Sequence, residues 1–244
     1  MTIQEIVHLL AREYGHRPWR PHRDPISELI LTILSQHTSD VNSSRAFEAL
    51  LAKFDNWEAV AASSIEEIAA AIWPAGLARV KAPRIKLILE RILGQRGSLD
   101  LAFLGELPLS KAKAWLERLP GVGPKTASCV LLFSLRRPSL PVDTHLYRVA
   151  KRLGLIGSRV SVAKAHQLLE PLVPVADIYQ FHLNMVEHGR RVCLAQHPKC
   201  QDCVLKEGCP TGSAKLLLKF INEPVAFDGA GLDTRENVSS GAKR

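Results

Sequence analysis

The chain has 244 residues, 46% hydrophobic and 23% charged, with a mean hydropathy of +0.01, which is typical of a soluble globular protein with a well-buried core. Nowhere do 18 apolar residues run uninterrupted, so we expect neither a membrane-spanning helix nor a membrane partner. Lys and Arg number 32 against 24 Asp and Glu, so the net charge is +8 and the pI is near 9.4. Such a balance favours a polyanionic ligand, but many basic proteins bind nothing acidic.

The first seventeen residues lack the apolar run and the small-residue cleavage site of a signal peptide. We therefore expect a cytoplasmic, nucleoid-associated protein. Thiols stay reduced in that compartment, so the five cysteines are interpreted first as metal ligands or core residues rather than as disulfides.

Apolar residues recur at helical spacing along most of the chain, and capping signals separate the predicted helices. A capping box of Thr2 and Glu5 predicts a first helix that ends near Gly15. Asp24 followed by Pro25 predicts the start of a second helix. Further helices are predicted after caps at Asp40, Ser64, Ser110, Asp143 and Ser161, and over about 81–93, 124–135 and 177–191.

No stretch shows the period-two alternation of a half-buried strand, so the predicted fold class is all-α. From about Glu223 the chain is polar and rich in glycine, after an apolar segment at 215–221. This end predicts a flexible tail.

Two of the predicted helices are joined by residues 119–124, Leu-Pro-Gly-Val-Gly-Pro. Glycine at 121 and 123 permits backbone conformations closed to other residues, and the N-terminus of the following helix offers unpaired N–H groups to a phosphate. A simple helix–helix turn, or the helix-turn-helix of a transcription factor, would also explain two glycines. The second helix, however, is apolar on nearly every face, whereas a recognition helix is polar.

Lys125 lies in the first turn of that apolar helix, where partial burial and the helix N-terminus favour the neutral, nucleophilic amine. A solvated lysine that touches phosphate is the alternative. Asp143 follows eighteen residues later and is predicted to cap the next helix. A carboxylate fixed in this way can accept a proton or stabilise positive charge that develops on a sugar.

Four cysteines near the C-terminus are spaced C-x6-C-x2-C-x5-C: Cys193, Cys200, Cys203 and Cys209. Four-thiolate zinc and an iron–sulfur cluster both fit this ligand set, and His188 or His197 could complete a mixed zinc site. The segment is short of large apolar residues, so a metal centre would supply its stability. Cys129 is expected to be a buried core thiol. Nearby basic residues are either phosphate contacts or solvated charges: Arg190, Arg191, Lys199 and Lys206.

The string LPGVGPKTA followed by PVDTHLYRV, together with the cysteine spacing, resembles the endonuclease III branch of the helix–hairpin–helix DNA glycosylases over roughly residues 1–212. The resemblance implies that Lys125 displaces the damaged base and forms a Schiff base with the deoxyribose. It implies that Asp143 is the catalytic carboxylate and that the four cysteines hold a [4Fe–4S] cluster. Monofunctional relatives look similar around the hairpin but lack the lysine.

The resemblance also implies how a base is flipped out of the duplex. If Asp40 anchors the match, His37 falls at the position that fills the gap, and Gln36 lies one residue earlier. Leu77, between two small residues, matches the wedge in the opposite strand. Further DNA contacts are expected along the hairpin and after the carboxylate, at Leu119, Pro120, Gly121, Val122, Gly123, Thr144 and His145.

The implied architecture is two helical domains with a DNA-binding cleft between them. A six-helix domain at 25–136 carries the hairpin, and an iron–sulfur domain is formed by 1–24 and 137–212, with an extension at 213–244. The expected function is that of a monomeric, bifunctional DNA glycosylase and AP lyase. It would excise oxidised pyrimidines from duplex DNA containing damaged bases or abasic sites, and nick by β-elimination.

Three alternatives stay open. The first is a monofunctional or mismatch-directed glycosylase with a weak lyase step, and the second is a non-catalytic protein that binds DNA damage. The third, a transcription regulator with a redox-sensing cluster, fits poorly with the apolar second helix and with the Lys125–Asp143 pair.

Overall fold

The computed structural model describes residues 1–214, and every regular element among them is helical, as the sequence predicted. No helix in this part of the chain is long and apolar enough to cross a membrane. The apolar segment at 215–221 and the tail from Glu223 lie outside the described residues, as does the predicted extension apart from its first two residues.

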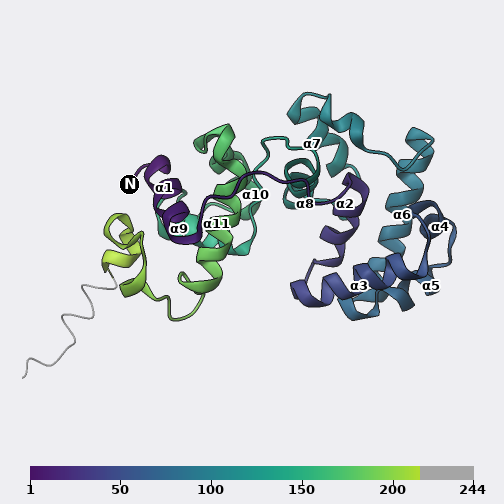
Figure 1. Ribbon diagram of the computed structural model, residues 1–244, viewed down its shortest axis with the longest axis horizontal. Coiled ribbons are helices and arrows are strands. Elements are labelled where there is room, and N and C mark those ends of the chain that lie inside the picture. The colour runs from purple at the N-terminus through teal and green to yellow at the C-terminus, as the bar shows by residue number, and fades with distance from the viewer. Residues whose placement is uncertain (215–244) are drawn as a thin grey trace, which may run out of the picture.

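One half of the molecule contains the middle of the chain (Figure 1). Two short 3-10 turns, η1 (Trp73–Ala75) and η2 (Ala102–Gly105), connect its helices. The helices are α2 (Pro25–Leu34), α3 (Asp40–Lys53), α4 (Trp57–Ala62), α5 (Ile65–Ala71), α6 (Ala78–Arg96), α7 (Leu109–Glu117) and α8 (Pro124–Cys129).

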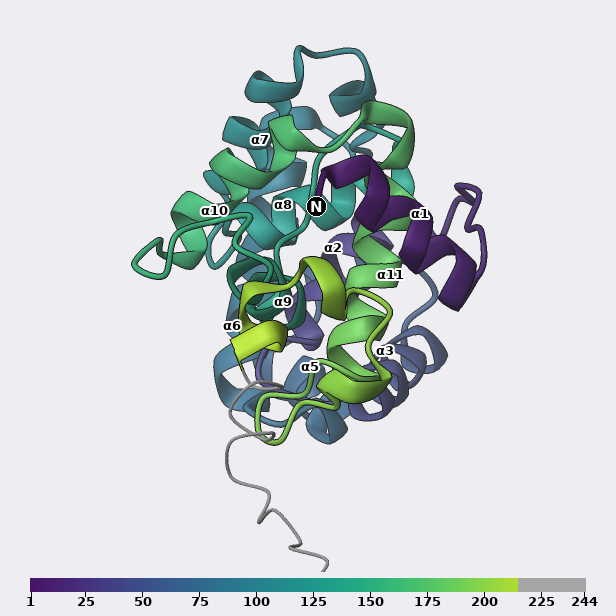
Figure 2. The same cartoon turned by 90° about the vertical axis from the view of Figure 1, so that its left-hand side faces the viewer.

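The other half combines the first helix with the later part of the chain. Helix α1 lies along α11 in both views (Figures 1 and 2), which brings the start of the chain beside residues more than 160 positions later. The elements of this half are α1 (Ile3–Tyr14), α9 (Thr144–Arg152), α10 (Val162–Leu169), η4 (Glu170–Leu172), η5 (Val175–Asp177), α11 (Ile178–Arg191), η6 (Cys200–Asp202) and η7 (Lys206–Gly208).

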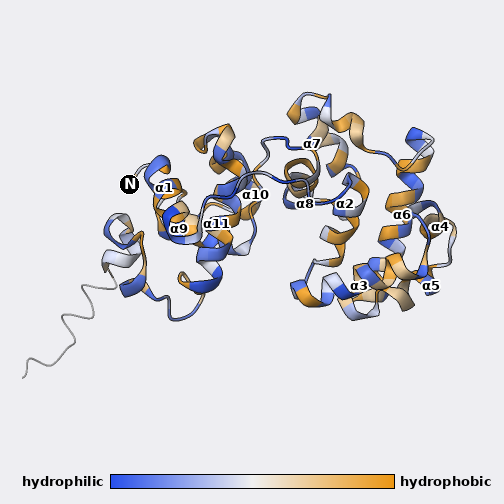
Figure 3. Ribbon diagram, viewed as in Figure 1, coloured by the Kyte–Doolittle hydropathy of each residue, from blue (hydrophilic) through white to orange (hydrophobic). Residues whose placement is uncertain are grey.

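Each half has its own hydrophobic core, formed by the apolar faces that the helices turn inward (Figure 3). The boundary between the cores follows α8 and the π-helix η3 (Val130–Ser134) that continues it. Residues Ala127, Val130 and Leu131 face the first core, whereas Cys129, Leu132 and Phe133 face the second. One apolar segment therefore joins the halves, while the domain boundaries at 24/25 and 136/137 stay predictions.

Most predicted caps are found. The side chains of Thr2, Asp24, Ser64, Asp143 and Ser161 each accept a hydrogen bond from the backbone N–H three residues later. Three assignments were wrong or missing. Ser39, not Asp40, caps α3; α7 begins at Leu109, before Ser110; and α4, capped by Asn56, was not predicted.

Candidate active site and nucleic-acid interface

The hairpin between α7 and α8 turns at two glycines that play different parts. Gly121 has φ +74°, a left-handed conformation that favours glycine, and the end of the Arg84 side chain occupies the place of a Cβ. Gly123 has φ −104° and ψ −177°, with open space around it, so the expectation of a special conformation was wrong there. Leu119 and Val122 are buried in the first core, and Val122 N donates to Leu119 O (3.1 Å), so the side chains of these two predicted DNA contacts are not exposed.

Helix α8 begins with Pro124 and is buried from Thr126 onward, as expected of a core helix that exposes only its start. After Cys129 the chain continues as the π-helix, in which Val130 and Leu131 pack in the first core, whereas Leu132 and Phe133 pack in the second. Lys125 is half-buried at the exposed end of this continuous helical segment.

Lys125 lies beside two buried acidic groups. Burial raises the pKa of the Cys129 thiol to about 11, and the charge and hydrogen bond of Lys125 oppose this rise. Burial also raises the pKa of Glu28 on α2, against the charges of Arg23 and Lys125. Glu28 is 5% exposed and its Oε2 makes no hydrogen bond, although Arg23 lies 3.9 Å away. A lone carboxylate inside the apolar helix 26–34 was the sequence signal for this site, and it was missed.

Asp143 caps α9, where its Oδ1 accepts a hydrogen bond of 2.7 Å from Leu146 N. Its charge and that of Lys125 both act on the buried His182 of α11. Burial lowers the pKa of His182 to about 4; the Asp143 carboxylate opposes this, and Lys125 adds to it. Cys129 also responds to both charges. The fold thus brings Lys125 and Asp143 together around one buried histidine and one buried thiol.

The backbone before Asp143 is held by buried or half-buried side chains from other elements. Three hydrogen bonds do this: Leu140 N to Glu170 Oε2 (2.8 Å), Val142 N to His166 Nε2 (3.1 Å), and His182 Nδ1 to Pro141 O (2.8 Å). Burial lowers the pKa of His166, which keeps its Nε2 available as an acceptor. The Ser139 hydroxyl also lies 2.8 Å from the Ser128 hydroxyl of α8. The position of the carboxylate is therefore fixed from several sides.

Gln36 and His37, the two residues predicted to lie near the gap left by a flipped base, differ in how firmly their side chains are held. The Gln36 amide is bound at both ends, because its Oε1 accepts from Arg84 Nη1 (3.0 Å) and its Nε2 donates to Gly121 O (3.2 Å). His37 is exposed and has φ +55°. Leu77, the predicted wedge, is 55% exposed and has φ +50°.

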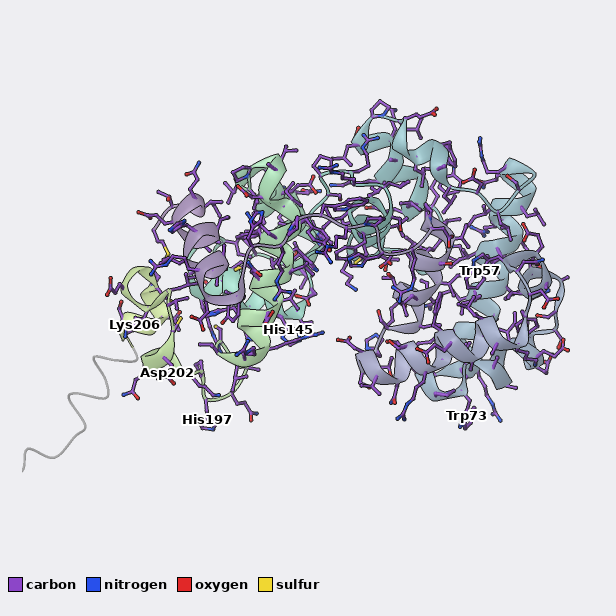
Figure 4. The ribbon with its side chains drawn as sticks, viewed as in Figure 1. Trp57, Trp73, His145, His197, Asp202 and Lys206 are labelled. Carbon is purple, nitrogen blue, oxygen red and sulfur yellow. The ribbon has the colours of Figure 1, made fainter. Side chains whose placement is uncertain are left out.

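The start of α9 faces the first half of the molecule. Thr144 is exposed, and His145 lies on the side of the second half that faces the first (Figure 4). His145 is half-buried, with its Nδ1 3.3 Å from Arg148 Nη2. It also lies against Gly189 of α11, where a Cβ would come within 2.9 Å of the His145 Cβ. Glycine at 189 therefore lets α9 and α11 approach closely.

The four cysteines line one pocket beside α9 and the end of α11. Two arginines of α9 hold the loop that carries the first cysteine. Arg152 donates to the carbonyls of residues 193–195 and, at 3.2 Å, to Cys193 Sγ, while Arg148 donates to Cys193 O. His188 is buried, with its Nε2 3.5 Å from Cys203 Sγ, and His197 is exposed.

The donor set fits a cationic metal centre held by thiolates. Burial raises the pKa of Cys203 to about 11 and also raises that of Cys209, and neighbouring thiolates raise both further. Four thiolates there need a compensating cation. Within residues 1–214, however, no three His, Cys, Asp or Glu side chains converge closely enough for a single metal ion. Four sulfurs around one pocket are the ligand set that both a four-thiolate zinc ion and an iron–sulfur cluster use.

Three of the four basic residues near the cysteines have protein partners in the free molecule. Arg190 forms an ion pair of 2.8 Å with Asp40 at the start of α3, and Arg191 forms one of 2.9 Å with Glu187. Lys206 donates to Gln201 O. Arg190 therefore connects one half of the molecule to the other. A DNA phosphate that bound Arg190 would compete with Asp40 for this exposed side chain.

Residues 30–174 match the family model described as HhH-GPD superfamily base excision DNA repair protein. Endonuclease III of Thermotoga maritima is 36% identical over 206 residues, which cover 84% of this chain and 92% of that protein. A structure of a trapped endonuclease III–DNA covalent intermediate, an estranged-adenine complex, is 30% identical with a TM-score of 0.73, covering 88% of this chain and 99% of the other. A non-covalent endonuclease III–DNA complex is 30% identical with a TM-score of 0.74, covering 88% and 97%.

Proposed function

Because the chain belongs to the endonuclease III family, within the HhH-GPD superfamily of base excision DNA repair proteins, we propose that it is a bifunctional DNA glycosylase and AP lyase acting on oxidised pyrimidines in duplex DNA. The observation that carries this proposal is that the segment ending at Asp143 is bonded to α8, which carries Lys125, through Ser139 and Ser128 (2.8 Å), and to buried His182 through Pro141 O (2.8 Å). The covalent intermediate trapped for endonuclease III itself supports a covalent route.

In the first step the neutral Lys125 amine attacks C1′ of the flipped nucleotide. The nitrogen lone pair forms the new bond as the glycosidic bond breaks, and the base leaves with the bonding electrons and takes up a proton. The Asp143 carboxylate stabilises the positive charge that develops on the sugar and accepts the proton that the amine loses. The hydrogen bond from Leu146 N holds Asp143 in place for this role.

In the second step the sugar ring opens to a Schiff base between Lys125 Nζ and C1′. Loss of a proton from C2′ expels the 3′ phosphate oxygen with its electrons, which nicks the strand by β-elimination. Water then hydrolyses the imine and frees the lysine.

His37 is the residue we assign to the gap, with Leu77 as the wedge in the opposite strand. The exposed, left-handed backbone of His37 leaves its ring free, whereas the amide of Gln36 is bound to Arg84 and Gly121. Replacing His37 by Ala is therefore expected to lower excision from duplex DNA more than replacing a nearby exposed residue without a capping role, such as Ser44.

The four cysteines are proposed to hold a [4Fe–4S] cluster, which would stabilise the loop anchored by Arg148 and Arg152. When bound, the cluster would supply structure and charge rather than chemistry on the base. Iron and sulfide content of the purified protein tests this, since Cys200→Ser is expected to lose the cluster, whereas Cys129→Ser, in the core, keeps it. One zinc ion per chain would contradict the assignment.

Borohydride trapping on a duplex with one abasic site tests the lyase. Reduction converts a Schiff base into a stable crosslink, so the wild type is expected to crosslink and Lys125→Gln is not. Lys111→Gln, on the exposed face of α7, is the matched control and should crosslink normally. Absence of a crosslink from folded, cluster-loaded wild type would contradict the lyase and favour a monofunctional or damage-binding protein.

We further propose that the protein acts on DNA as a monomer in the cytoplasm, associated with the nucleoid. Binding that neutralises several phosphates must weaken steeply with salt. A flat salt response in a binding titration on duplex DNA would contradict the basic interface.

A further inference from the structure

A buried lysine joins two loops of the first half. Lys81 on α6 is 2% exposed, and its Nζ donates to Leu34 O (2.7 Å) and to Ala75 O (2.9 Å). Leu34 ends α2 and Ala75 ends η1, so both carbonyls lie at helix ends, where the backbone lacks internal donors. Burial lowers the pKa of Lys81, since a charged amine is costly to remove from water unless it is hydrogen-bonded.

Each of these carbonyls precedes a strained, exposed residue. His37 follows Leu34 by three residues, and Leu77 follows Ala75 by two. Their φ angles of +55° and +50° lie in the left-handed region, which non-glycine residues rarely adopt. Such strain persists only where surrounding contacts hold it. The described chain contains four non-glycine residues of this kind, and these are two of them.

Helix α6 makes a second connection one turn later. Arg84 donates to Gln36 Oε1 and lies against Gly121 of the hairpin. The loop before α6 is also open to solvent: Trp73 is 68% exposed and projects from the edge of the first half (Figure 4). The first two turns of α6 thus contact the loop of His37, the loop of Leu77 and the hairpin.

We propose that Lys81 is a positioning residue that holds His37 and Leu77 in their strained, exposed conformations and fixes the spacing between them. Gap filling and wedging then occur as one event, because neither loop has to be ordered separately on the DNA. This inference rests on the proposed repair function, in which these two residues enter the duplex. Lys81 itself is buried and does not touch DNA.

The test uses the full, cluster-loaded protein and a duplex with one abasic site opposite 2-aminopurine, whose fluorescence rises when its stacking is disturbed. Lys81→Met keeps the aliphatic stem and removes both hydrogen bonds. Lys86→Met is the matched control, because Lys86 also lies on α6 and donates to two carbonyls, Ala61 O and Ser63 O, at the C-terminal end of α4. Both variants are checked for helix content and thermal unfolding.

Lys81→Met is expected to reduce the fluorescence rise and to slow borohydride trapping on the duplex by at least about tenfold, since small misplacements of positioned groups have effects of this size or larger. Lys86→Met should lower stability without this loss. In a Leu77→Ala background, Lys81→Met should add little, because interacting residues give non-additive losses.

Fully additive losses, or equal fluorescence changes in the two lysine variants, would overturn the proposal. If Lys81→Met does not fold, Lys81→Gln, which keeps one amide donor, takes its place, and normal 2-aminopurine fluorescence in that variant would overturn it too. A wild type that never traps at all would instead refute the proposed function, so the two failures are distinguishable.

Discussion

The Lys113 ammonium on α7 lies 2.6 Å from both carboxylate oxygens of Glu170 on η4, and Glu170 Oε2 also accepts a hydrogen bond from Leu140 N. One carboxylate therefore connects the first helix of the hairpin to the segment that ends at Asp143. The Lys113–Glu170 pair therefore fixes the position of the hairpin, which would bind DNA, relative to the segment that carries Asp143.

Glu170→Gln is expected to lower the free energy of unfolding by about 2 kcal/mol, because a charged hydrogen-bond partner of Lys113 and Leu140 N is lost from a largely buried site. Trapping on abasic DNA should fall as well. Glu90→Gln is the control, since Glu90 forms an exposed i,i+4 pair with Lys86 and should matter by less than about 0.5 kcal/mol. Chemical denaturation of both variants checks this, and equal losses would contradict it.

Asp143 combines a capping role with a proposed catalytic role, and two substitutions separate them. Asn caps helices about as well as Asp, so Asp143→Asn should leave the unfolding free energy within about 0.5 kcal/mol. Asp143→Ala should cost about 1 kcal/mol, because the bond to Leu146 N is lost. Both variants should lose activity by about a hundredfold or more, since both remove the charge. An active Asp143→Asn variant would contradict the catalytic role and leave Asp143 only its capping role.

His182 makes stability depend on pH. Its pKa in the folded protein is about 4, below the usual 6.5, because it is buried; Asp143 opposes this effect, while Lys125 and Arg190 add to it. The unfolded chain therefore takes up this proton first. Stability is fully present above about pH 6.5 and falls as the pH is lowered toward 4, by up to about 3 kcal/mol.

His182→Asn keeps a donor for Pro141 O and removes the titration, so its unfolding free energy should vary less between pH 6.5 and pH 4. Urea unfolding of both proteins at several pH values measures the difference. Parallel curves would show that His182 does not carry the effect.

Glu28 should oppose stability when it is ionised, because burial raises its pKa despite the charges of Arg23 and Lys125. The contribution of Glu28 to the free energy of unfolding is most favourable at low pH. It weakens as the pH rises from the pKa of an unfolded glutamate toward the raised pKa of Glu28 in the folded protein. Glu28→Gln at pH 7 should therefore raise the unfolding free energy by about 1 kcal/mol, since Oε2 has no hydrogen bond to lose. A destabilised variant would instead mean that the attraction to Arg23 and Lys125 exceeds the effect of burial.

Features that depend on residues close together in the chain could be predicted from the sequence. The all-helical fold follows from apolar periodicity, and the caps at Thr2, Asp24 and Asp143 follow from side chains that bond backbone three residues away. The wrong prediction of Asp40 as the N-cap of α3 also concerns neighbouring residues, because the adjacent Ser39 takes the N-cap position. Asp40 instead pairs with Arg190. Helix α4 was missed because its six residues give too short a pattern.

The rest of the site depends on contacts between distant residues, which no local pattern contains. Lys81 reaches a carbonyl 47 residues away, and His182 reaches one 41 residues away. The left-handed backbone of His37 and Leu77 could not be predicted from the sequence either, since neither residue is the glycine or asparagine that usually adopts this conformation. Family resemblance pointed to those two positions, but only the fold shows what holds them.

The packing of α1 on α11 has a consequence for biosynthesis. Tyr14 and Arg17 bond to His188 and Glu187, partners that leave the ribosome about 170 residues later. The first half can fold while those partners are still being made, but the second half must wait. A nascent chain that ends near residue 160 should therefore present the hairpin without a fixed Asp143, whose backbone is held by His166, Glu170 and His182. On the proposed function, such an intermediate would bind DNA without a fixed catalytic carboxylate, and strand cleavage would begin only after His166, Glu170 and His182 have been made.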